Sequence, residues 1–228
     1  MIGDAEWQAI NLSLRLALCT TLVLLIIAVP LGWWLSQTKS SLKVIIEAIV
    51  TLPLVLPPTV LGFYLLILFA PQSPFGGWWL SLTGKPLVFD FYGLLMGSVL
   101  YSLPFVVQPI RDGFMAVRQE WLDVCHVMGA SQWQRFRYLL LPLNKQAMLT
   151  AAIMGFAHTM GEFGVVLLIG GNIPGETRVI SIALYDLIET MQYEQANWLA
   201  GGLLVMSFAV LALVSLLQKS HARAYLKG

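Results

Sequence analysis

Residues 16–31 read LALCTTLVLLIIAVPL and contain no charged side chain. They form the core of a longer apolar segment, residues 10–35, with Arg15 near one end and Trp33 and Trp34 at the other. A helix that crosses a bilayer needs about 20 predominantly apolar residues. Arginine can extend its charge to one membrane interface, and tryptophan is typical of the other. We therefore expect a first membrane-spanning helix over residues 10–35.

The same kind of segment returns along the chain. Of its 228 residues, 58% are apolar and only 11% are charged, whereas soluble domains are about 25% charged. Four further segments satisfy the length criterion, at residues 44–70, 91–115, 147–169 and 198–217. The sequence predicts an all-α membrane protein with about five transmembrane helices. They form one transmembrane domain, residues 9–217, followed by a short cytoplasmic tail, residues 218–228.

Prolines interrupt the second of these segments, and charged residues separate the third from the fourth. Pro53, Pro57 and Pro58 lie inside the second segment, which must bend or break there because proline cannot donate a backbone hydrogen bond. Residues 111–138 are too polar to span, yet their apolar residues recur at steps of three and four. Gly129 offers a helix stop and Ser131 a new N-cap. We expect a pair of short helices between spans three and four.

The basic residues predict the orientation. If residues 111–138 are cytoplasmic, ten of the 13 basic residues lie inside, which the positive-inside rule favours. The N-terminus is then outside and the C-terminus inside. The inner group is Lys39, Lys43, Arg111, Arg118, Arg135, Arg137, Lys145, Lys219, Arg223 and Lys227, and the outer group is Arg15, Lys85 and Arg178.

The segment between spans three and four carries a recognisable spacing. The residues Asp123, Val124 and Cys125 are followed, after three more residues, by Gly129. In the coupling loop of binding-protein-dependent ABC importers, Glu-Ala-Ala is followed by Gly at the same spacing. Leu139, Leu141 and Pro142 then match the Ile, Leu and Pro that close that loop. The segment therefore resembles a coupling loop, in which a short helix docks into a cleft of a separate ATPase subunit. The alternative is an amphipathic helix lying among lipid headgroups, favoured by Arg118, Arg135 and Arg137.

Span four contains the stretch GFAHTMGEFG, residues 155–164. A charge at the bilayer centre costs about 3 kcal/mol, so Glu162 should face a cavity or a partner, with His158 one turn earlier on the same helix face. Gly155, Gly161 and Gly164 allow close helix approach. The Gly-Glu-Phe-Gly run is similar to permeases for tetrahedral oxyanions. We expect Glu162 to be a gate or a helix-packing element, protonated or paired to a cation, rather than a ligand for the anion.

A third stretch, NIPGETR at residues 172–178, resembles the molybdate permeases in particular. On the predicted topology it faces outward, where a soluble binding protein would dock, and the candidate contacts are Asn172, Pro174, Glu176 and Arg178. Arg178 has two possible roles, contact with that partner or neutralisation of Glu162. The plain alternative is a Pro-Gly turn.

Together these resemblances imply the permease subunit of a molybdate ABC importer. They imply a homodimer in the bacterial inner membrane, two cytoplasmic ATPase subunits and an outer oxyanion-binding protein. ATP and Mg would bind the ATPase, and this chain would be neither an enzyme nor the holder of a cofactor or metal. It also has no nucleotide-binding loop, since Gly84 and Lys85 are followed by Pro86.

Other functions remain open from the residues alone. A sulfate or tungstate permease would share every feature above, because these anions are also tetrahedral. A proton-coupled secondary transporter could use His158 and Glu162, although such proteins usually carry an internal repeat. A membrane enzyme or an assembly scaffold is a third class, and the lack of a clustered polar site in this sequence argues against the enzyme. The net charge of +1 excludes a strongly basic nucleic-acid binder.

Overall fold

The computed structural model describes the backbone of residues 3–225 and the side chains of residues 3–216. Within these limits the chain is helical and contains no strand. The predicted tail, residues 218–228, lies outside the described side chains, as do Lys219, Arg223 and Lys227. The elements are α1 Asp4–Gln37, α2 Leu42–Val55, α3 Pro58–Phe69, α4 Pro74–Thr83, α5 Phe91–Met115, α6 Gln119–Val127, α7 Gln132–Arg135, the π-helix η1 Phe136–Leu140, α8 Leu141–Leu143, α9 Lys145–Met160, α10 Gly164–Gly170, α11 Ile180–Glu189 and α12 Tyr193–Tyr225.

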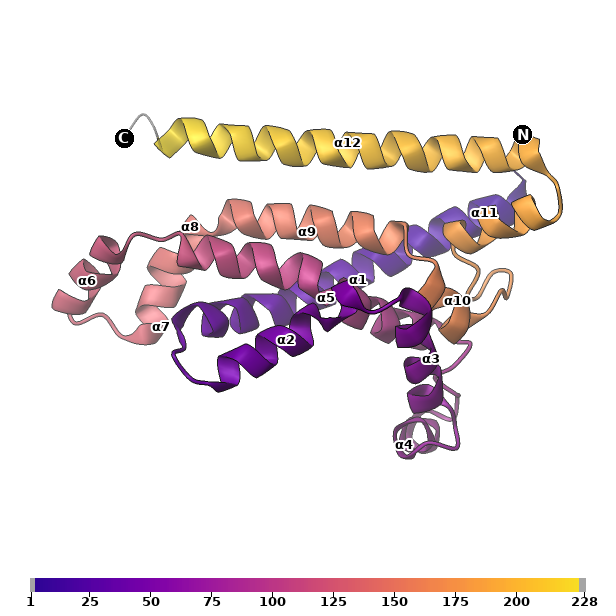
Figure 1. The fold of residues 1–228 in the computed structure, drawn as a ribbon, viewed down its shortest axis with the longest axis horizontal. Helices are drawn as coiled ribbons and strands as arrows, with labels where there is room; N and C mark the ends of the chain where they lie inside the picture. The colour runs from indigo at the N-terminus through magenta and orange to yellow at the C-terminus, as the bar shows by residue number, and fades with distance from the viewer. Residues whose placement is uncertain (1–2, 226–228) are drawn as a thin grey trace.

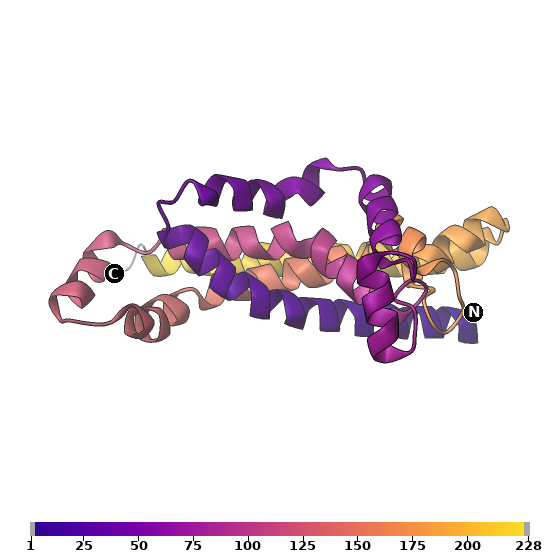
Figure 2. The ribbon, with the colours of Figure 1, turned by 90° about the horizontal axis from the view of Figure 1, so that it is seen from below.

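Three helices form the centre of the bundle. Helices α1, α5 and α9 lie side by side, and α12 runs along α9 (Figures 1 and 2). Leu24 of α1, Val106 and Ile110 of α5 and Ala151 of α9 are fully buried between them. Outward-facing positions carry large apolar side chains instead, such as Ile26, which is 75% exposed. Such a surface is unstable in water and stable against lipid tails.

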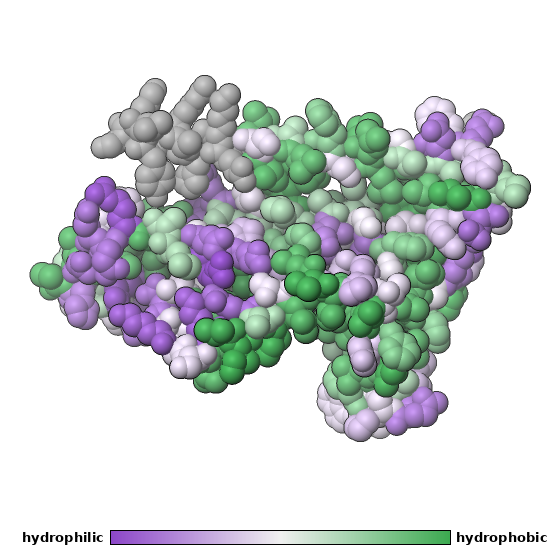
Figure 3. Space-filling model, in the orientation of Figure 1, coloured by the Kyte–Doolittle hydropathy of each residue, from purple (hydrophilic) through white to green (hydrophobic). Residues whose placement is uncertain are grey.

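The length and hydropathy of the helices agree with a membrane protein. Helices α1, α5 and α12 are each long and apolar enough to cross a bilayer. Two bent helix pairs pass the same test, which gives five candidates if each pair is one span. Among the described residues, polar side chains cluster at the α6–α7 end of the visible face, and an apolar region covers its middle (Figure 3).

The second predicted span is sharply bent, as its prolines require. The chain bends by 113° between α2 and α3, and α3 points away from the long helices of the bundle (Figure 1). Leu56, which precedes Pro57, has an extended backbone with ψ 136°, because the proline ring excludes the helical conformation at the residue before it. Pro58 then starts α3, where a missing N–H costs nothing.

The fourth predicted span, residues 147–169, differs from a continuous helix. Helix α9 ends at Met160 and α10 begins at Gly164, so Glu162 lies in the break between them. The expectation that His158 and Glu162 share a helix face is therefore wrong. The N–H groups of Gly161 and Glu162 turn back to the last carbonyls of α9, which satisfies the end of that helix locally.

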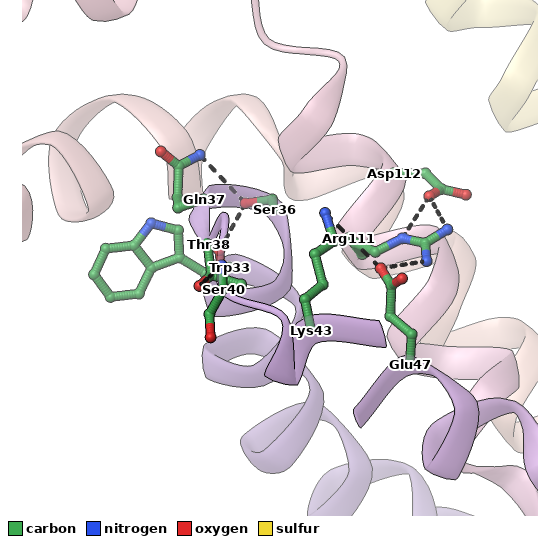
Figure 4. A network of polar contacts seen from close by, with 9 residues as sticks. All are labelled: Trp33, Ser36, Gln37, Thr38, Ser40, Lys43, Glu47, Arg111 and Asp112. Atoms are coloured by element: carbon green, nitrogen blue, oxygen red, sulfur yellow. Dashed lines mark hydrogen bonds and ion pairs between the residues drawn. The ribbon is translucent and has the colours of Figure 1, made fainter. Parts of the chain in front are cut away.

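A polar network joins α2 to α5 near the α6–α7 end of the bundle (Figure 4). Arg111 of α5 lies 3.1 Å from Glu47 of α2 and 2.7 Å from Asp112, and Lys43 lies 4.0 Å from Glu47. Helix α2 buries only Val50 and Pro53. The ion pair of Glu47 and Arg111 is therefore an important part of what holds α2 against the bundle.

The two ends of the bundle carry different parts of the chain. The N-terminus, α10 and α11 lie at one end, and α6 and α7 lie at the other (Figure 1). Helix α12 runs back from the first end toward the second. This is the relative placement that the predicted topology requires of the segments on the two sides of the membrane.

Candidate functional site

The break between α9 and α10 borders a cavity of about 580 Å³. Its walls come from α3, α5, α9 and α10, so residues far apart in the sequence meet there. The lining residues are Pro58, Thr59, Tyr101, Ala157, His158, Gly161, Glu162, Phe163, Gly164, Leu167 and Leu168. Most are apolar, and Thr59, Tyr101, His158 and Glu162 supply the polar side chains.

Glu162 is the most unusual of these side chains. It is only 3% exposed, and neither carboxylate oxygen has a hydrogen-bond partner among the described residues. Its backbone carbonyl, in contrast, accepts a 2.5 Å hydrogen bond from the hydroxyl of Ser181 in α11. The backbone is thus fixed at this position, and the buried carboxyl group lies beside the hydroxyl of Ser98 in α5, which also lacks a well-formed hydrogen bond.

His158 is held by a small cluster of hydroxyl groups. Its Nδ1 lies 2.9 Å from the Ser102 hydroxyl, which lies 3.1 Å from the Thr159 hydroxyl. The ring stacks on Phe105 of α5, with 3.9 Å between ring centroids. These contacts fix the imidazole in one orientation at the cavity wall. The sequence indicated His158 but not Ser102 or Tyr101, and the only available signal was hydroxyl groups within an otherwise apolar span.

Two of the three glycines predicted to allow close packing do so. A Cβ added at Gly155 would come within 2.6 Å of Val106, and one at Gly164 within 2.8 Å of Pro58. At Gly161 the nearest atoms are 3.8 Å away, so this residue makes no close approach within the chain. Close packing at Gly161 therefore stays a prediction that no contact among the described residues supports.

The predicted short-helix pair is present at the far end of the bundle. Helix α6 ends in a turn in which the Ala130 N–H donates to the Cys125 carbonyl at 2.9 Å, and Gly129 adopts the left-handed conformation with φ 71°. Ser131 then caps α7 in a capping box with Gln134. The sequence predicted both the stop and the cap.

Helix α6 buries none of its residues within the chain. Val124 is 57% exposed, and Val127 and Met128 are 89% and 79% exposed. Asp123 is also exposed and accepts a 3.0 Å hydrogen bond from Gln119 one turn earlier. Cys125 is half-buried beside a groove of about 460 Å³ that Met128 and Gly129 also line. We call α6 and the turn that follows it, residues 119–129, the knob. The knob thus presents apolar side chains at the polar end of the bundle.

The base of this knob is fixed to the bundle. Phe136 of η1 lies between Trp33 of α1, at 4.4 Å between ring centroids, and Trp133 of α7, at 5.5 Å. Leu141, which is half-buried, and Pro142, which is exposed, form α8 directly before α9. The segment that follows α6 is therefore packed against α1 through Phe136.

The outer-end loop, residues 172–178, is closed by its own polar contacts. Arg178 donates to Asn172 at 2.5 Å and lies 3.5 Å from the Asp186 carboxylate of α11. Thr177 is fully buried, and its hydroxyl donates a 2.6 Å hydrogen bond to the Gly170 carbonyl. The exposed residues of the loop include Pro174 and Glu176.

The position of Arg178 contradicts one of its two predicted roles. Its contacts are with Asn172 and Asp186, and neither oxygen of Glu162 has a partner among the described residues. The alternative that Arg178 neutralises Glu162 is therefore wrong in this conformation. Sequence reasoning missed Asp186, because an acidic residue near the end of a short helix carries no distinguishing signal.

The candidate residues form three separate groups along the length of the bundle. The knob lies at one end, the outer loop at the other, and the cavity at the α9–α10 break between them (Figure 1). Among the described residues, no cluster of His, Cys, Asp and Glu could hold a metal ion. The described residues therefore offer an exposed surface at each end of the bundle and a cavity between the two ends.

Comparison with known families accounts for this arrangement. Residues 28–225 match the family described as the binding-protein-dependent transport system inner membrane component. The chain belongs to this family. Its fold is similar to that of a solved bacterial ABC transporter involved in alginate import, with a TM-score of 0.73 at 17% identity over 96% of this chain and 80% of that one.

Within this inner membrane component family, two similar relatives are molybdenum transport system permease proteins called ModB. The one from Azotobacter vinelandii is 50% identical, and the match covers 92% of this chain and 93% of that relative. The one from Escherichia coli K12 is 32% identical, and the match covers 95% of this chain and 93% of that relative. A probable sulfate transport system permease from Marchantia polymorpha is 31% identical over 92% of this chain and 73% of its own length.

Proposed function

We propose that this chain is the membrane-spanning permease subunit of an ATP-driven importer and that it translocates molybdate. The 50% identity to a molybdenum permease, over nearly the whole of both chains, carries the proposal. The match to a sulfate permease is more distant, at 31% identity. Molybdate is therefore preferred to sulfate, and tungstate, with the same shape and charge, is the remaining alternative.

The surfaces that the fold leaves open support an assembly with partner chains. We propose a homodimer in the cytoplasmic membrane, with the pathway between two copies, the N-terminus outside and the C-terminus inside. Helix α6 supplies an exposed apolar knob with Asp123 on it, which suits docking into a cleft of an ATPase subunit. ATP and Mg would bind that subunit, and this chain itself would hold no cofactor.

The packing suggests how the chain converts docking into transport. Closure of two ATPase subunits would draw the α6 knobs of the two copies together. Phe136 and its aromatic neighbours would pass that movement to α1 and α9. The α9–α10 break, where the cavity lies, would then open alternately to the two sides. The outer loop, closed by Arg178 and Asp186, suits the docking of an oxyanion-binding protein.

Uptake of labelled anions tests the proposal directly. Cells that lack this gene are compared with cells in which it is restored, using molybdate, with and without excess sulfate or tungstate. We expect restored molybdate uptake that sulfate does not suppress. Restored uptake of sulfate in place of molybdate would retain the importer and change its substrate. No restored uptake of any of the three anions would contradict the proposal.

A further inference from the structure

A polar cleft lies between the knob and the neighbouring ends of α1 and α5. It has a volume of about 470 Å³. Three of its lining residues are basic: Lys39 directly after α1, His126 of α6 and Arg135 of α7. Asp123 is the one lining residue with a carboxyl group, and it already accepts the 3.0 Å hydrogen bond from Gln119. The cleft therefore carries an excess of basic side chains.

The fold does not pair the two strong cations of this cleft. Among residues 3–216, Lys39 and Arg135 take part in no ion pair. Arg135 is half-buried, and its buried Nε has no hydrogen-bond partner among these residues. It also borders a smaller cavity of about 60 Å³ with Trp33 and Leu140, so it lies inside the junction between α7 and the bundle. A half-buried guanidinium without an acceptor is costly, and an anion in the cleft would remove that cost.

The cleft lies at the level where two long helices end. Its lining includes the last two residues of α1, Ser36 and Gln37, and the last two residues of α5, Phe114 and Met115. The headgroup region of a bilayer begins where the apolar spans end. On the predicted topology this end of the bundle is cytoplasmic, and basic pockets between helices on that side bind anionic lipid headgroups. The phosphate group of a lipid is therefore the anion that this level of the membrane supplies.

The remaining walls suit a lipid better than a free oxyanion. Phe114, Val117 and Leu122 are apolar and share the cleft with the basic side chains. A free phosphate ion would use only the cations, because it has no apolar part. A phospholipid carries its phosphate directly beside an apolar ester and acyl region, so it uses both kinds of wall.

Docking of the ATPase does not compete for this cleft. At 3.6 residues per turn, the lining positions of α6, which are 119, 122, 123 and 126, share one face of the helix. Val124 and Met128, which belong to the apolar surface proposed to dock, project from the opposite face. An occupant of the cleft would thus lie between the knob and the bundle.

We propose that this cleft binds the phosphate of an anionic phospholipid from the cytoplasmic leaflet, held by Arg135 and Lys39. A guanidinium group binds phosphate oxygens through parallel N–H donors, and an ammonium group adds a compact charge. The inference goes beyond the proposed function, because it does not depend on which anion is transported. A bound lipid would also fix the knob in its position beside α1 and α5.

Lipid binding by the complex of permease and ATPase provides the first test. The delipidated complex is titrated with phosphatidylglycerol in detergent and observed by native mass spectrometry. Arg135→Gln should weaken the tightest binding by about ten-fold, as expected for one charge-assisted hydrogen bond. Arg137→Gln removes an exposed arginine that does not line the cleft, so it is the matched control and should bind like the wild type.

A second variant keeps the test valid if Arg135→Gln disturbs the packing of α7. Lys39→Gln lies in the exposed loop after α1 and should weaken the tightest binding by about five-fold, as expected for one lysine near an anionic lipid. Wild-type binding by Lys39→Gln together with wild-type binding by Arg135→Gln, or with its failure to fold, would overturn the proposal.

Competing ligands identify the source of the phosphate. Phosphatidylcholine, whose choline neutralises its phosphate, should bind at least about ten-fold more weakly than phosphatidylglycerol. Inorganic phosphate at millimolar concentration should not displace phosphatidylglycerol. Displacement would assign the cleft to a free anion and overturn the lipid proposal, as would equal binding of the two lipids. A wild type that binds phosphatidylglycerol in this way and fails to import molybdate would contradict the proposed function alone.

Discussion

The side-chain amide of Asn144 donates a 3.0 Å hydrogen bond to the backbone carbonyl of Ile110, across the interface between the start of α9 and the end of α5. Asn144 is 2% exposed and lies just after Leu141 and Pro142, where the coupling segment joins the bundle. Gly113, one turn along α5, makes this contact possible, because a Cβ there would lie 1.9 Å from the Asn144 side-chain oxygen. The start of α9 and the end of α5 are thus linked by a buried hydrogen bond.

Replacing Asn144 should weaken both stability and coupling. Asn144→Ala removes a buried hydrogen bond and leaves the Ile110 carbonyl without this partner, which costs about 1–3 kcal/mol. We expect a lower thermal unfolding midpoint of the purified permease and less uptake per ATP hydrolysed by the complex. Asn197→Ala, at an exposed position of α12, is the control. Equal midpoints for the two variants would contradict the importance of the contact.

Gly113 should be intolerant of even one methyl group. The added Cβ of Gly113→Ala would also lie 2.6 Å from the Ala147 side chain, so α5 and α9 must separate, at a cost of about 1–3 kcal/mol. Gly201→Ala in α12 meets no atom within 4 Å and should be neutral or stabilising by up to about 1 kcal/mol. Denaturation in detergent measures both. A Gly113→Ala variant as stable as Gly201→Ala would show that the two helices do not pack this closely.

The ion pair of Glu47 and Arg111 should hold α2 against α5. The two side chains are 28% and 25% exposed, so the pair is partly screened and worth about 1 kcal/mol. Glu47→Gln and Arg111→Gln should each destabilise the permease, and the double variant should cost less than their sum. A double-mutant cycle on unfolding free energies measures this coupling, with the exposed pair Arg118 and Glu120 as the weaker reference. Additive effects would mean that the pair contributes nothing.

The outer loop should depend on Asp186 and not on Glu162. Arg178→Ala and Asp186→Asn both remove the 3.5 Å ion pair that ties the loop to α11. We expect both variants to bind the loaded binding protein more weakly than the wild-type complex, by a similar factor, in a pull-down or surface-binding assay. Adding Glu162→Gln to Arg178→Ala should restore nothing. Restored binding would instead mean that Arg178 and Glu162 compensate each other in the assembled transporter.

A charge on the apolar surface of the knob should prevent docking of the ATPase subunit. Val127 is 89% exposed on α6, and Val127→Glu leaves the isolated fold unchanged while placing a charge where the ATPase is proposed to dock. We expect loss of co-purification with the ATPase and of ATP-driven uptake. Val44→Glu, 69% exposed on α2, tests whether any charged substitution on the surface has this effect. Normal assembly of the Val127→Glu variant would exclude α6 as the docking helix.

Features that depend on nearby residues could be predicted from the sequence. The run of apolar residues 16–31 needs lipid, the prolines at 53, 57 and 58 force a bend, and Gly129 with Ser131 ends one short helix and begins another. Each of these follows from interactions of a residue with its close neighbours in the chain or with its solvent. The spacing from Asp123 to Pro142 and the run of residues 172–178 likewise indicated the family before any coordinates.

Only the tertiary structure decided which distant residues meet. The sequence could not show that Arg178 pairs with Asp186, that Ser102 holds His158, or that α9 ends before Glu162, because these outcomes depend on competing contacts between helices. An ionisable residue in an apolar run predicts a partner or a cavity without saying which. The packing of α3, α5, α9 and α10 forms the cavity, and it buries Glu162 in the break between α9 and α10.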